Sequence, residues 1–99
     1  MYWTAKGLED TGDVKLVRFA DGRLFSILPD RNKKPPKYTL FDELGVIEGS
    51  PQHQGPMSQD LLTSILNSSG ATPISLGDAK LVRADHRAKV RQKEPGGDR

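Results

Sequence analysis

Apolar and polar residues alternate on both sides of Asp21-Gly22, and this alternation is the clearest structural signal in the chain. The runs from Val14 to Phe19 and from Leu24 to Leu28 are rich in residues that favour β-strands. Asp-Gly favours a two-residue type I′ turn, because both central residues of that turn need a positive φ. The pattern therefore predicts an antiparallel hairpin in which Leu16 faces Ile27, Arg18 faces Phe25 and Phe19 faces Leu24.

Both faces of the predicted hairpin are largely apolar. In that register one face carries Val14, Leu16, Phe25 and Ile27, and the other carries Val17, Phe19, Leu24 and Leu28. Strands that are apolar on both faces are normally covered on both sides. We therefore expect a central hairpin, with the main core on one side and a helix, another sheet or a partner on the other.

Helical periodicity is clear only between residues 58 and 68. Ser58 is a favourable N-cap, and Met57 and Leu62 occupy the two positions of a hydrophobic staple. An apolar stripe follows, made of Leu61, Leu62, Ile65 and Leu66. Gly70 is suited to a left-handed C-terminal cap. These signals predict a helix that packs on the core.

The remaining segments have weaker patterns. The composition predicts a strand over 38–41, a turn or single helical turn over 42–45, a short strand over 46–48 and a surface loop over 49–56. It then predicts a strand over 73–76 and a turn at 77–78. Residues 79–84 are either a second strand, which their similarity to the first strand favours, or the start of a helix that runs to about Glu94.

Together these elements predict the α+β class. We expect a small, mostly antiparallel sheet or partly open barrel with one packed helix, followed by a basic C-terminal strand, helix or tail. The expected division is a single domain over residues 1–84 and a basic C-terminal extension over residues 85–99. The chain of 99 residues has the length of one domain.

Composition narrows the classes of protein that the chain can belong to. There is no cysteine, which excludes disulfides, thiolate metal sites and a cysteine nucleophile, and which suits a reducing cytoplasm. No apolar run is long enough for a signal peptide or a membrane span. We therefore expect a cytoplasmic protein without a membrane partner.

Charged residues are sorted into three blocks along the chain. Residues 1–37 contain eight Lys or Arg and five Asp or Glu, and residues 38–79 contain five acidic residues and no basic one. Residues 80–99 contain seven basic and three acidic residues. Such sorting gives a folded protein a strong dipole, which steers the approach of charged partners.

The basic C-terminal block is the first candidate binding element. If residues 83–91 are helical, Arg83, Arg87 and Arg91 form one ridge, and arginine matches the geometry of phosphate with two parallel hydrogen bonds. The candidate nucleic-acid contacts in this block are Arg83, Arg87, Lys89, Arg91 and Lys93. The alternatives are a solvated tail, or a tail docked on the acidic middle of the same chain, at Asp42, Glu43, Glu48 or Asp60.

A basic loop with two prolines is the second candidate. It contributes Lys33, Lys34 and Lys37 as possible phosphate contacts, and its alternative interpretation is a solubilising surface loop. Exposed aromatic rings would favour binding of single strands, and Trp3 and Tyr38 are the aromatic residues least committed to the core.

The sequence contains no catalytic motif. His53 and His86 lack metal-ligand spacing, the Asp42-Glu43 pair fits an exposed acidic turn, and no phosphate-cradling glycine loop is present. We therefore expect no enzyme activity, no cofactor and no metal. The hypothesis that follows is a small non-catalytic accessory protein that contacts nucleic acid through its basic end. The alternative hypothesis is a protein interaction module, or a homo-oligomer, that uses its separate acidic and basic surfaces.

Overall fold

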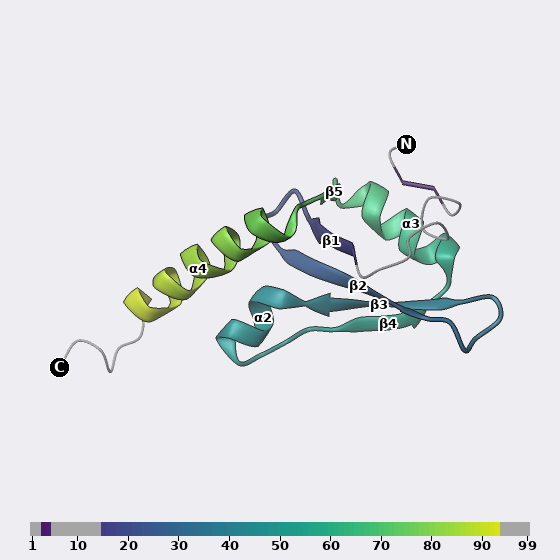
Figure 1. Ribbon diagram of the computed structural model, residues 1–99, viewed down its shortest axis with the longest axis horizontal. Coiled ribbons are helices and arrows are strands. Elements are labelled where there is room, and N and C mark those ends of the chain that lie inside the picture. The colour runs from purple at the N-terminus through teal and green to yellow at the C-terminus, as the bar shows by residue number, and fades with distance from the viewer. Residues whose placement is uncertain (1–2, 5–14, 94–99) are drawn as a thin grey trace.

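The computed structural model describes residues 3–4 and 15–93, which form an open antiparallel sheet with helices on both faces (Figure 1). The strands are β1 (Lys15–Arg18), β2 (Leu24–Asp30), β3 (Lys37–Asp42), β4 (Gln54–Met57) and β5 (Thr72–Pro73). Their order in the sheet is β4-β3-β2-β1-β5, and every pairing is antiparallel. The helices are α2 (Glu43–Glu48), α3 (Gln59–Ser68) and α4 (Leu76–Lys93). The predicted α+β class, with a partly open antiparallel sheet, is confirmed.

The β1–β2 hairpin forms where the sequence predicts it, but its register differs by one residue. Val17 lies opposite Phe25, whereas the prediction placed Arg18 there. The reason is the conformation of the turn. Gly22 has φ of 97°, and no described residue other than glycine has a positive φ. Gly22 N donates to Phe19 O at 2.9 Å. A type I′ turn needs two positive φ values, so the connection is instead the three-residue kind that ends in a left-handed glycine.

The corrected register divides the apolar residues of the hairpin between two clusters. Val17, Phe19, Phe25 and Ile27 join Tyr38, Leu40, Met57, Leu62 and Leu66 in the main core, which α3 covers. Leu24 belongs to a second cluster on the opposite face, with Leu44 from α2 and Ala79 from α4. The expectation that both faces are covered is therefore confirmed for this part of the hairpin, although Val14 lies outside the described residues.

Helix α2 occupies the segment for which a turn and a short strand were predicted. Asp42 is its N-cap, with Oδ1 accepting a hydrogen bond from Gly45 N at 2.9 Å, and Gly49 closes the helix with φ of 82°. The β-favouring Val46 and Ile47 are thus helical, because a cap at each end outweighs a weak strand propensity. The loop predicted over 49–56 was also partly wrong, since β4 begins at Gln54 and pairs with β3.

Helix α3 agrees closely with the prediction. Ser58 Oγ accepts from Leu61 N at 3.2 Å, and Gly70 adopts a left-handed φ of 62°. Leu66 O accepts from Ala71 N at 3.0 Å, as in a Schellman C-cap. One detail was wrong: Leu61 is 52% exposed, so the buried stripe does not include it.

The strand predicted over 73–76 is correct only at its start, since β5 ends at Pro73 and Ile74 N still donates to Leu16 O of β1 at 3.0 Å. Helix α4 begins at Leu76 and replaces the turn predicted at 77–78 and the strand favoured over 79–84, whereas the alternative of a helix to about Glu94 is correct up to Lys93. Ser75 acts as its N-cap, because Ser75 Oγ accepts from Asp78 N at 3.1 Å. The helix continues through residues 84 and 85 without a break and carries the chain away from the sheet (Figure 1). Within the part of the chain that the structure describes, no helix is long and apolar enough to cross a membrane.

Candidate functional site

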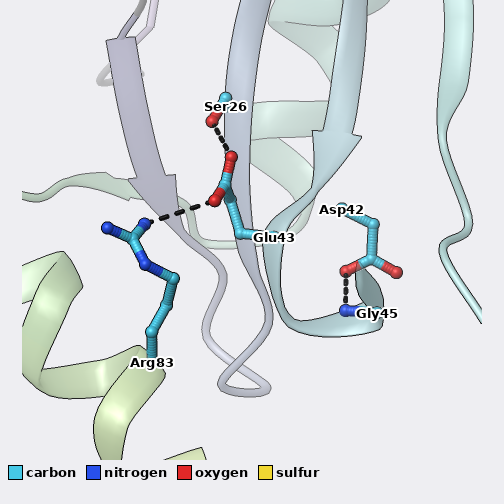
Figure 2. Close-up of polar contacts among 5 residues, drawn as sticks. All are labelled: Ser26, Asp42, Glu43, Gly45 and Arg83. Atoms are coloured by element: carbon cyan, nitrogen blue, oxygen red, sulfur yellow. Dashed lines mark hydrogen bonds and ion pairs between the residues drawn. The ribbon is translucent and has the colours of Figure 1, made fainter. Parts of the chain in front are cut away.

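Glu43 connects the sheet to helix α4, as Figure 2 shows. Its Oε2 accepts a hydrogen bond from Ser26 Oγ at 2.5 Å, and its Oε1 accepts from Arg83 Nη1 at 3.2 Å. Only 19% of the Glu43 side chain and 21% of the Arg83 side chain are exposed. Arg83 therefore belongs to the fold, and its guanidinium is directed at Glu43 instead of at solvent.

A second contact continues the same interface one turn further along α4. His86 Nε2 lies 2.6 Å from Glu48 Oε2, near the end of α2. Two members of the acidic middle block, Glu43 and Glu48, thus meet two members of the C-terminal block. The alternative in which the basic stretch docks on acidic residues of its own chain is correct for Arg83 and His86. It is wrong for Asp42, whose carboxylate caps α2 and also accepts from Gln52 N.

Three cations of α4 remain exposed on one side of the helix. Lys80, Arg87 and Arg91 are separated by seven and four residues, so they follow one line along the helix, and we call them the basic flank. Among the described residues, none of the three forms an ion pair. Lys89 lies on the opposite side of α4 and pairs with Asp85 at 3.3 Å. Lys93 is the last residue of the helix.

A cavity of 370 Å³ lies beside this flank, between α2 and α4. Val46, Ile47 and Val90 provide its apolar lining, and Arg87 and Arg91 lie at its edge. Val46 is 49% exposed, so this lining is accessible to solvent. The surface around the two arginines therefore combines positive charge with apolar contact area.

The second predicted basic element lies far from α4. Lys33 and Lys34 are exposed in the loop between β2 and β3, and Lys37 begins β3. This loop is at one end of the molecule, and the free end of α4 is at the other (Figure 1). The fold does not combine the two basic elements into one continuous patch.

A groove of 620 Å³ lies between the hairpin turn, α2 and α4. Its charged side chains are mostly paired with each other, including Arg23 with Asp21 at 2.8 Å. The hydrogen bond from the backbone N–H of Arg23, together with the Arg23 side chain, lowers the pKa of Asp21 below its ordinary value. The four acidic residues of the groove exceed its three Lys and Arg residues by one, so the groove has no positive charge surplus that would favour an anionic ligand.

Both histidines contact other structural elements, His86 through Glu48 and His53 through β3. His53 Nδ1 accepts a hydrogen bond from Asp42 N at 3.2 Å, and the His53 ring stacks on Phe41 with 4.2 Å between the ring centroids. Among the residues that the structure describes, no group of His, Asp and Glu could hold a metal ion. Trp3 and Tyr38, which were candidates for exposed aromatic contacts, are only 6% and 4% exposed.

The Phe41–His53 stack is the feature that sequence reasoning missed. The alternation in β3 would have placed Phe41 on the face opposite Tyr38 and Leu40. Nothing in the sequence indicated that His53, twelve residues later and in an expected loop, lies on the Phe41 ring.

Comparison with protein-family models, with curated proteins and with solved structures finds no match for this chain. The function must therefore be inferred from the chemistry of these surfaces.

Proposed function

We propose that this chain is a non-catalytic binding protein that contacts the phosphate backbone of nucleic acid through the basic flank of α4. The observation that supports the proposal is the exposure of Lys80, Arg87 and Arg91 along one line of a helix, without an ionic partner among the described residues. Unpaired cations on a rigid element are ready to neutralise phosphates, and arginine can do so with two parallel hydrogen bonds.

The geometry of α4 is favourable for this contact. Lys80 and Arg91 are eleven positions apart, which corresponds to about 16 Å along the helix axis. The contacts of Arg83 and His86 with α2 fix the helix, so that little conformational freedom of its backbone is lost on binding. The non-catalytic part of the proposal is supported by the roles of Asp42, Glu43 and Glu48, which cap or connect helices.

The test is a titration of labelled oligonucleotides at several salt concentrations, with fluorescence anisotropy as the measurement. Each lost contact with duplex DNA lowers the slope of log affinity against log salt by about 0.9. Replacing Lys80, Arg87 and Arg91 together by Gln should therefore reduce the slope by up to ~2.7 and leave the melting temperature nearly unchanged. Because these contacts are with phosphates, the loss should be similar for all base sequences.

Lys89→Gln is the matched control, since it removes one charge from the opposite side of the same helix. Its effect on the slope should be smaller than that of any single substitution in the basic flank. Absence of binding by the unmodified protein at low salt would refute the proposal. An unchanged salt slope in the triple variant would also refute it.

A second candidate function is contact with a protein, including a second copy of this chain. It is favoured by two leucines on α4, Leu76 and Leu81, which are 61% and 69% exposed. Light scattering over a concentration series would detect self-association, and Leu81→Gln should abolish it if the α4 surface is responsible. A constant monomer mass would exclude the homo-oligomer.

A further inference from the structure

One face of the sheet is open beyond the region that α2 and α4 cover. Leu28 lies opposite Thr39, and Ser26 lies opposite Phe41, so these four residues form two adjacent rows on one face of β2 and β3. Ser26 is covered through its bond to Glu43, but Leu28 is 37% exposed. The other face of the same strands carries Ile27, Tyr38 and Leu40, and it is buried under α3.

His53 is held flat at the edge of this open face. Its ring stacks on Phe41 with an interplanar angle of 25°, and Asp42 N donates to Nδ1. Because Nδ1 is an acceptor, the proton of the neutral ring is on Nε2. His53 is nevertheless an exposed residue, so the face of the imidazole turned away from Phe41 is available to a flat ligand.

Basic residues border the open face. Lys37 lies on the same side of β3 as Thr39 and Phe41, because side chains in a strand alternate, and Lys33 and Lys34 are exposed in the adjoining loop. Two carboxylates are close. Asp30 is the cross-strand neighbour of Lys37, and its Oδ1 accepts from Asn32 N at 3.1 Å. Glu43 is bound to Ser26, the cross-strand neighbour of Phe41, and its charge is paired with Arg83. Since Arg83 balances the charge of Glu43, the three lysines face only the charge of Asp30, and the border favours an anionic ligand.

We propose that this face, made of Leu28, Thr39, Phe41 and His53, is a binding site for single-stranded nucleic acid. An unpaired base would stack on the exposed face of the His53 imidazole, with Leu28 and Thr39 beneath the neighbouring nucleotide. Phosphates would lie along Lys33, Lys34 and Lys37. Flat rings beside a cationic border are the general arrangement by which proteins bind single strands without reading sequence.

The arrangement specifies an unpaired strand because the faces of a base in a duplex are covered by the adjacent base pairs. Only an unstacked base can lie on His53. This inference rests on the proposed function in taking nucleic acid as the ligand, but it assigns the contact to different residues. The face also lies on the same side of the sheet as α4, since Leu24, Ser26 and Leu28 alternate with the core residues of β2.

The deciding experiment compares the affinity for oligo-dT with the affinity for a duplex of equal length, both measured by fluorescence anisotropy. His53→Ala should weaken binding of oligo-dT roughly 5- to 100-fold and leave duplex binding unchanged. His53→Tyr, which keeps a flat ring, should retain the affinity for oligo-dT. Gln52→Ala is the control, because it shortens the adjacent exposed side chain and leaves the stack intact.

A second measurement does not depend on any substitution. The chain contains two histidines, so the ring protons of His53 and His86 can be followed separately by NMR during titration with oligo-dT. Stacking should shift the His53 ring protons upfield in proportion to binding, and the His86 signals should move less.

The outcomes separate this inference from the proposed function. If neither oligo-dT nor duplex binds, both fail. If duplex binds through the basic flank but His53→Ala leaves oligo-dT binding unchanged, the inference is wrong and the proposed function stands. If polyglutamate competes as well as oligo-dT for the His53 site, the site recognises negative charge alone, as for an acidic protein partner, and the inference is also wrong.

Discussion

Replacement of Glu43 by Gln tests whether the contact in Figure 2 holds α4 against the sheet. The substitution preserves the shape of the side chain but removes the charge that faces Arg83. An exposed ion pair contributes about 0–1 kcal/mol, and breaking a fully buried pair costs about 3–5 kcal/mol. The side chains here are 19% and 21% exposed, which places the pair between these limits. We expect the free energy of unfolding to fall by about 2–3 kcal/mol.

The assay is urea denaturation followed by circular dichroism, applied to a double-mutant cycle of Glu43→Gln and Arg83→Met. The cycle cancels the contribution of Glu43 to the dipole of α2 and isolates the interaction of the two side chains. We expect a coupling energy of about 1.5–2 kcal/mol. For a chain of this length, the single substitution should lower the melting temperature by about 10–15 °C.

Glu48→Gln is the matched control, because Glu48 also pairs with a residue of α4, His86, but its side chain is 49% exposed. This substitution should lower the free energy of unfolding by less than about 1 kcal/mol. A coupling energy under about 0.5 kcal/mol for Glu43 and Arg83 would refute the argument that this pair holds α4 in place. So would an equal cost for the two Gln substitutions.

Substitutions at four further positions test the local structure, each by the midpoint of urea denaturation. Phe25→Ala should cost about 3–5 kcal/mol, because Phe25 is 1% exposed in the main core, and an unchanged midpoint would contradict this packing. Ser58→Ala should cost about 1 kcal/mol through loss of the α3 N-cap, and Ser58→Asp should restore it. Gly22→Val should cost about 1–3 kcal/mol because of the positive φ, whereas Gly77→Ala, at an open position in α4, should be neutral or stabilising by up to about 1 kcal/mol.

The elements that the sequence alone predicted correctly are those determined by local chemistry. The caps of α3 at Ser58 and Gly70 act over a few residues, so they can be recognised without knowledge of the fold. The strand around Tyr38–Phe41 was likewise visible from its composition. The register of the hairpin was not, because Asp-Gly fits two turn types that differ by one residue in the pairing.

The candidate sites were predictable only in part. Spacing alone indicated that Arg87 and Arg91 share one line if the segment is helical. Whether Arg83 belongs to that line depended on where α2 places Glu43, which is a tertiary contact 40 residues away. The stack of His53 on Phe41 likewise requires β4 to pair with β3, and no local signal predicted that pairing.

The sequence Lys-Leu-Val-Arg occurs twice and shows what tertiary structure decided. At Lys15–Arg18 it is strand β1, and Val17 is fully buried opposite Phe25. At residues 80–83 it lies within α4, where the helical period turns Val82 and Arg83 toward α2 and the sheet and leaves Leu81 69% exposed. Four residues with mixed propensities do not determine their own backbone conformation. Whether they form a strand or a helix depends on the surface against which their apolar side chains can be buried.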